Sequence, residues 1–211
     1  MGKWPVLCLN DQTFYAYLSD YQVQDEEFAS VGGVFLSKGY GHFAMPGGQL
    51  DRYYSVLAHE LCHAQLATLQ LPGWLDEAVT MIVEENLNGI PSYFLNREMI
   101  RRHRAYWSPA KLQDFWAGTT FWSPDDGQEL SYHLSRFLFN ALFQGGTVDP
   151  NNISHFILAA QRQDAGLTAA KEMLDIDLSE VVSSLLGEGD WSPDLEKISA
   201  TKVQLEAPNA P

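Results

Sequence analysis

One cluster of residues in the sequence could do metal chemistry. His59, Glu60 and His63 form an H-E-x-x-H motif. Residues four apart lie on one face of an α-helix with Cβ atoms about 5–6 Å apart, so two such imidazoles can bind one Zn²⁺ ion. Zinc lowers the pKa of a coordinated water toward about 7, and Glu60 could accept the proton of that water as a general base. The motif therefore predicts a hydrolytic zinc site.

A catalytic zinc site needs a third protein ligand and an open coordination position. Glu77, fourteen residues after His63, is the predicted third ligand, and the neighbouring Asp76 is the alternative. Either carboxylate could instead complement the positive end of the helix that begins near Trp74.

Two consecutive helices must position these side chains. Apolar residues recur at helical spacing over 51–70, and Leu71-Pro72-Gly73 separates that helix from a second one over 74–86. Before them, the sequence predicts three strands and a short helix that Asp11 would cap. The strands are expected at 6–10, 31–36 and 42–46, the helix at 12–19, and a hairpin connection at 38–41.

Beyond residue 88 the sequence predicts only helices. They are expected over 92–106, 128–144, 152–163, 167–174 and 178–186. We expect one catalytic domain in three parts, with the cleft between the first two. These are an α+β half (1–88) with both metal-binding helices, a helical half (89–195) that completes the cleft, and a polar tail (196–211).

Together with Pro72, Trp74, Leu75 and Glu77, the motif resembles the signature of the gluzincin zinc metallopeptidases, H-E-x-x-H followed by L-P-x-W-L-x-E-G. The pattern is most similar to that of the compact bacterial thermolysin-like, or peptidase MA-like, domains, over about residues 5–190. The resemblance implies an α+β, zincin-like fold with a small, mostly antiparallel sheet. It also implies Zn²⁺ as cofactor, Glu77 as third ligand, and a peptide or protein substrate.

The chain departs from the family pattern at three points. Ala78 replaces the usual glycine, and the interval between the motif and the third ligand is shorter than in thermolysin. Met81 stands where the family often has an acid that orients a zinc-bound histidine. Thr80 or Glu84 could take that orienting role.

The resemblance further implies a donor for the oxyanion, which gluzincins supply as a Tyr or His of the helical half. Tyr132, at the head of the helix over 128–144, is the leading candidate. A half-buried core tyrosine is the alternative interpretation. His133 and His103 are the next candidates, although the basic run around His103 is typical of a solvated helix face.

In the relatives, the strand that precedes the zinc helix is the sheet edge that pairs with an extended substrate. Here that strand is 41–45, and it could instead be an inner hairpin strand. His42 within it is expected to be a surface residue rather than a fourth ligand.

Composition narrows the function classes. The 211 residues are 45% hydrophobic and 12% aromatic, with 13 Lys+Arg against 27 Asp+Glu and a net charge of −14. Such a chain can bury a core, and its charge repels phosphate backbones, so no nucleic-acid partner is expected. No apolar run reaches the roughly 20 residues of a membrane span. Cys8 and Cys62 are too few for a disulfide framework and are expected to be buried thiols, which favours a reducing, cytoplasmic environment.

Two functions from different classes agree with these residues. The first is a zinc-dependent peptidase with Glu60 as general base, and the second is a catalytically silent zinc-binding relative that acts as a protein-interaction module. A third interpretation is a helical protein with a coincidental motif. Glu60 favours the enzyme, because structural zinc sites need no such base and are usually Cys-rich and closed.

Overall fold

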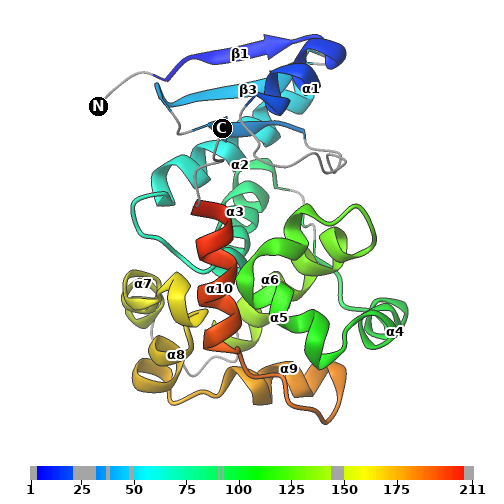
Figure 1. Ribbon diagram of the computed structural model, residues 1–211, viewed down its shortest axis with the longest axis vertical. Coiled ribbons are helices and arrows are strands. Elements are labelled where there is room, and N and C mark those ends of the chain that lie inside the picture. The colour runs from blue at the N-terminus through cyan, green and yellow to red at the C-terminus, as the bar shows by residue number, and fades with distance from the viewer. Residues whose placement is uncertain are drawn as a thin grey trace.

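The computed structural model describes residues 4–20, 32–36, 39–47, 50–89, 91, 93–143 and 150–206. The fold is α+β and mostly helical, with one small sheet at one end of the molecule (Figure 1). The strands are β1 (Val6–Leu9), β2 (Val34–Leu36) and β3 (His42–Pro46). The helices are α1 (Asp11–Ser19), α2 (Leu50–Leu66), α3 (Gly73–Asn88), α4 (Arg97–Tyr106), α5 (Pro109–Ala117), α6 (Gly127–Phe143), α7 (Pro150–Ala159), α8 (Leu167–Leu174), α9 (Leu178–Leu186) and α10 (Leu195–Glu206), with short 3₁₀ turns η1 (Thr119–Trp122) and η2 (Arg162–Asp164).

The sheet is mixed, with the strand order β1-β3-β2. β2 and β3 form the expected antiparallel hairpin, but β1 runs parallel to β3. The prediction of a mostly antiparallel sheet was therefore only half right. Helix α1 follows β1 and contacts β3, and together with β2 it lies in the long connection between these two parallel strands.

The strand order also corrects the predicted substrate edge. β3 is the central strand of the sheet, so residues 41–45 belong to the inner strand of the hairpin. The edge strand of the hairpin is β2. Phe35 of β2 and Phe43, opposite it on β3, lie on the sheet face that α2 covers. On this face Gly33 lies close to Val56 of α2. The other face packs against Phe14 of α1.

The core of the helical half extends through α3 to the residues predicted to bind metal. Trp74 and Leu75, in the first turn of α3, are fully buried and pack with Leu130 and Leu134 of α6. The indole N–H of Trp74 donates to the carbonyl of Ala165 across 2.8 Å. These contacts anchor the start of α3, and with it the residues that follow Leu75.

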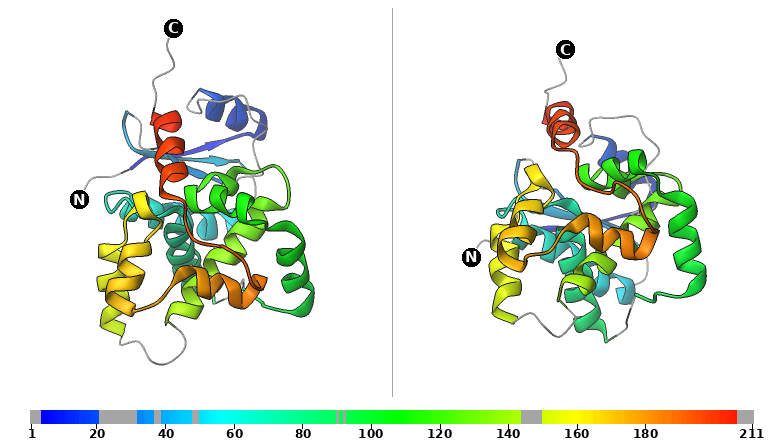
Figure 2. Two further views of the ribbon diagram at one scale, coloured as in Figure 1. Left: turned by 60° about the horizontal axis from the view of Figure 1, so that its bottom comes forward. Right: turned by 90° about the horizontal axis from the view of Figure 1, so that it is seen from below.

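Several elements differ from the sequence prediction for local reasons. The α1 helix starts one residue early, because Asn10 rather than Asp11 accepts the N–H of Thr13. The expected polar tail contains α10, which contacts α5 (Figure 2) and buries Ile198. Its first turn is capped by Asp194, which accepts two backbone N–H groups.

Three further features bear on the sequence prediction: a helix, the two cysteines and the absence of a membrane span among the described residues. Helix α5 was missed, although Ser108 caps it and Pro109 opens it, as helix starts commonly do. Cys8 is exposed and Cys62 is partly exposed, so neither is the buried thiol that was expected. Within the described residues, no helix has both the length and the apolar character to cross a membrane.

Candidate metal centre

The H-E-x-x-H motif lies on α2, and the proposed third ligand lies on α3, which runs antiparallel to it. The connection leaves α2 after Leu66, and α3 begins at Gly73 directly after Pro72. Burial of Trp74 and Leu75 turns the next two residues, Asp76 and Glu77, toward α2.

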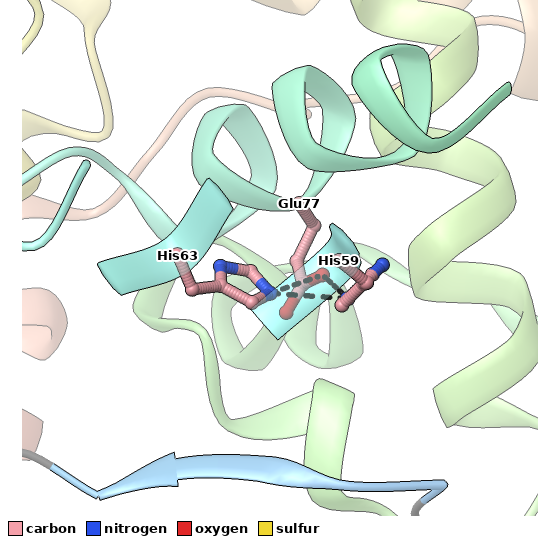
Figure 3. A group of neighbouring side chains, drawn as sticks. All are labelled: His59, His63 and Glu77. Atoms are coloured by element: carbon pink, nitrogen blue, oxygen red, sulfur yellow. Dashed lines mark hydrogen bonds and ion pairs between the residues drawn. The ribbon is translucent and has the colours of Figure 1, made fainter. Parts of the chain in front are cut away.

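His59, His63 and Glu77 converge on one point (Figure 3). The two Nε2 atoms lie 3.1 Å apart, and Glu77 Oε2 lies 3.5 Å from His59 Nε2 and 3.4 Å from His63 Nε2. Ligands bound at about 2.0–2.1 Å in a tetrahedron are separated by about 3.3 Å. The three donor atoms therefore have the spacing of three corners of a zinc site.

The buried surroundings of Glu77 Oε2 favour a bound cation. This oxygen is buried, and among the described residues it has no hydrogen-bond partner. Its contacts with the two imidazoles are longer than ordinary hydrogen bonds. A buried carboxylate oxygen without a hydrogen bond is costly, and a cation at this point would satisfy it. The site could thus hold a metal ion.

The carboxylates and the histidines of the site stabilise each other's charged forms. Burial raises the pKa of Glu77, but the facing His59 and His63 outweigh it and lower the value to about 2. Burial likewise lowers the pKa of both histidines, yet nearby carboxylates raise that of His59 to about 9 and that of His63 to about 11. The pocket therefore favours positive charge between the helices, as a metal site requires.

Each candidate histidine ligand also has a carboxylate at its other ring nitrogen. Glu84 Oε2 lies 3.0 Å from His59 Nδ1, and Asp76 Oδ2 lies 3.3 Å from His63 Nδ1. Such contacts orient metal-binding imidazoles and increase their basicity. Asp76, the alternative third ligand, is thus on the outer side of His63, whereas Glu77 faces the Nε2 atoms. Thr80, the other orienting candidate, lies 3.5 Å from His63 Nδ1.

Glu84 is itself held by residues that the sequence did not indicate. Ser55 donates to Glu84 Oε1, and Asn88 donates to Ser55 Oγ across 2.9 Å. Ser55 lies about one helical turn before His59, and this spacing is the feature of the sequence that could have indicated its place beside the site. The contribution of Asn88 depends on the antiparallel packing of α2 and α3, which no local pattern encodes.

Glu60 points from α2 toward the sheet. Its Oε2 accepts the backbone N–H of Phe35 across 2.9 Å. Burial raises the pKa of Glu60, although the charges of His59 and His63 act in the opposite direction. A carboxylate with a raised pKa is better suited to accept a proton from water than an exposed one.

Tyr132, Glu60 and His59 line one cavity of about 300 Å³. The remaining lining residues are Gly32, Gly33, Val56, Glu84, Gln128 and Glu129. Burial and the charges of Glu77 and Glu60 raise the pKa of Tyr132, so its hydroxyl stays protonated as a donor. The structure thus places this predicted residue beside the candidate base, with its ring against Phe121.

The other two donor candidates lie in a separate buried network. Trp107 Nε1 donates to His103 Nδ1 across 2.9 Å, and His103 Nε2 lies 2.8 Å from His133 Nδ1. His103 is fully buried, so the expected solvated helix face is wrong at this position. Neither His103 nor His133 lines the cavity.

His42 is buried rather than on the surface, because β3 is the central strand. Its Nε2 lies 2.7 Å from the hydroxyl of Tyr17, and its Nδ1 lies 2.7 Å from the carbonyl of Tyr40. It is not part of the group that could hold a metal.

Comparison of the chain with models of protein families, with curated proteins and with solved structures found no significant match.

Proposed function

We propose that this chain is a zinc-dependent peptidase of the gluzincin type. The observation that carries the proposal is the convergence of His59, His63 and Glu77, of which His59 lines the same cavity as Glu60 and Tyr132. Three nitrogen and oxygen ligands leave one coordination position open, which is typical of catalytic rather than structural zinc sites.

His59, His63 and Glu77 would hold the ion, which would supply Lewis acidity that activates water and polarises a carbonyl. Glu60 accepts a proton from the attacking water and passes it to the nitrogen of the departing amine. The Tyr132 hydroxyl donates a hydrogen bond to the carbonyl oxygen as negative charge develops on it.

The expected substrate is a peptide or protein. An edge strand offers free N–H and C=O groups to an extended chain. β2 is the edge on this side of the sheet, where the N–H of Phe35 donates to Glu60, and Gly32 and Gly33, which lead into it, line the cavity. A peptide alongside β2 would lie next to Glu60, which contacts Phe35 of this strand.

The test combines metal analysis with hydrolysis of a mixed peptide library. We expect zinc near one per chain and cleavage that Glu60→Gln reduces by about 10²–10⁴ in rate without loss of zinc. Glu172→Gln, an exposed position on α8, is the matched control and should behave as wild type.

The two other interpretations predict different results. Stoichiometric zinc without cleavage of any library peptide would favour the silent, protein-interacting relative. Absence of bound zinc after loading would leave the motif as a coincidence.

A further inference from the structure

The candidate base is attached to the backbone of the sheet. Phe35 N–H donates to Glu60 Oε2 across 2.9 Å, and Phe35 is the middle residue of β2. The residues that lead into β2, Gly32 and Gly33, line the cavity together with Glu60. This hydrogen bond therefore joins the substrate-side edge of the sheet to the residue that would transfer protons.

The direction of this N–H identifies the open groups of the edge. In an antiparallel pair, opposite residues alternate between hydrogen-bonded and non-hydrogen-bonded pairs. Phe35 lies opposite Phe43, and its N–H points to Glu60, so this is a non-hydrogen-bonded pair. The carbonyl of Phe35 must then point to the same side. No other described strand pairs with β2 there.

We propose that the Phe35 amide is a donor shared by Glu60 and the substrate. In the resting protein it holds Glu60, and an extended peptide that adds to β2 accepts the same N–H and thereby frees Glu60. The inference rests on the proposed peptidase function and adds a substrate class to it, namely extended chains of several residues.

Competition for one donor explains this selectivity. A carboxylate is a stronger acceptor than a peptide carbonyl, so a single carbonyl does not displace it efficiently. A longer peptide can also donate to the outward carbonyl of Phe35 and extend past Gly33 and Gly32, which line the cavity, and these contacts offset the loss. A dipeptide is too short to make all of these contacts, so it meets a Glu60 that is still bound to the strand.

Phe35→Pro tests the proposal, because proline has no N–H and is tolerated at sheet edges. Phe35→Ala is the matched control, since both variants lose the ring contacts with Trp4 and Phe43. Relative to Phe35→Ala, we expect Phe35→Pro to raise kcat/KM on a blocked dipeptide by roughly tenfold. On an octapeptide it should change less than about twofold, because the bond to Glu60 and the bond to substrate are both lost.

The ratio of octapeptide to dipeptide kcat/KM should therefore fall by roughly tenfold in Phe35→Pro. An equal decrease on both substrates would mean that the amide only positions Glu60, and would overturn the shared-donor proposal. Equal values for both variants on both substrates would overturn it as well.

Amide hydrogen exchange followed by NMR gives a readout without catalysis. Glu60→Ala should accelerate exchange at Phe35 by at least about tenfold, while the flanking Val34 and Leu36 amides, paired with β3, stay protected. Added octapeptide should restore protection at Phe35. Unchanged exchange in an active peptidase would refute this inference alone, whereas the expected exchange without cleavage by the wild type would refute the peptidase function alone.

Discussion

At the scale of single residues, the site depends on which atom of each side chain faces inward. Glu77 and Asp76 are neighbours on α3, yet Glu77 Oε2 faces both Nε2 atoms and Asp76 Oδ2 faces the outer nitrogen of His63. The sequence could rank these two carboxylates only through the family resemblance. Successive residues of an α-helix are rotated by about 100° around its axis, so Asp76 and Glu77 point in different directions. Burial of Trp74 and Leu75 fixes the rotation of α3 and thereby decides which carboxylate faces the Nε2 atoms.

Glu84→Gln should weaken zinc binding by about 10–100-fold, because it removes the charge that orients His59 and increases its basicity. The measurement is zinc affinity by competition with a chromophoric chelator. Glu172→Gln serves as the control. An affinity equal to that of the wild type would show that the packing of α2 against α3 orients His59 without the charge of Glu84.

Tyr132→Phe should lower kcat by roughly 10²–10³ with little change in KM, because the hydroxyl acts on charge that develops in the transition state. Ring contact with Phe121 is kept, so the melting temperature should hardly move. Steady-state kinetics and thermal melting check both statements. Unchanged kcat would leave Tyr132 as a packing residue of α6.

At the scale of elements, α4 and α6 are joined by a directional chain of hydrogen bonds. The indole N–H of Trp107 can only donate, so His103 Nδ1 accepts, and His103 donates from Nε2 to His133 Nδ1. His133 Nε2 then donates to the carbonyl of Phe94 across 3.3 Å. Burial and the neighbouring His133 lower the pKa of His103 to about 3, because a second ring proton would oppose the indole donor.

This hydrogen-bond network predicts a loss of folding stability in acid. The unfolded chain binds a proton at His103 below about pH 6.5, whereas the folded chain binds one only near pH 3. Stability should therefore fall as pH decreases from 6.5 toward 3, by up to about 1.4 kcal/mol per pH unit from this group. Urea unfolding at pH 7.0 and 5.0 should show a smaller decrease for His103→Gln than for wild type. Equal decreases would contradict the assignment.

The sequence predicted elements best where glycine or proline bordered the apolar periodicity on at least one side. Helices α8 and α9 were predicted to the residue, and α2 and α3 to within a few residues. It failed where position is decided by distant partners. The direction of β1, the central place of β3 and the burial of His42 all follow from strand order, which local patterns do not contain. α10 was missed because its contact face is narrow and most of its described side chains are polar or exposed.

At the scale of the whole molecule, a bound ion would join α2, which packs against the sheet, to α3, which packs against α6 of the helical half. A ligand present at 100 times its Kd stabilises the folded state by about 2.7 kcal/mol. Zinc should therefore raise the melting temperature by roughly 5–10 °C for a domain of this size. Differential scanning calorimetry with and without a chelator measures the shift.

Two variants separate the ligand from its neighbour in the same experiment. Glu77→Gln should abolish the zinc-dependent shift, whereas Asp76→Asn should reduce it without abolishing it, because Asp76 orients His63 and does not bind the ion. The reverse result would make Asp76 the third ligand.

The two helices that carry the proposed zinc ligands, α2 and α3, are consecutive, and this has a consequence for the order of folding. Only a short loop must close to bring His63 to Glu77, and short closures cost little entropy. β1 instead pairs Val6 with Phe43, a much longer separation along the chain. Local contacts form faster than distant ones, so we expect the α2–α3 hairpin to assemble before the sheet is complete. On this order of events, zinc would enter an early intermediate, and the edge that receives substrate would form afterwards around a metal already in place.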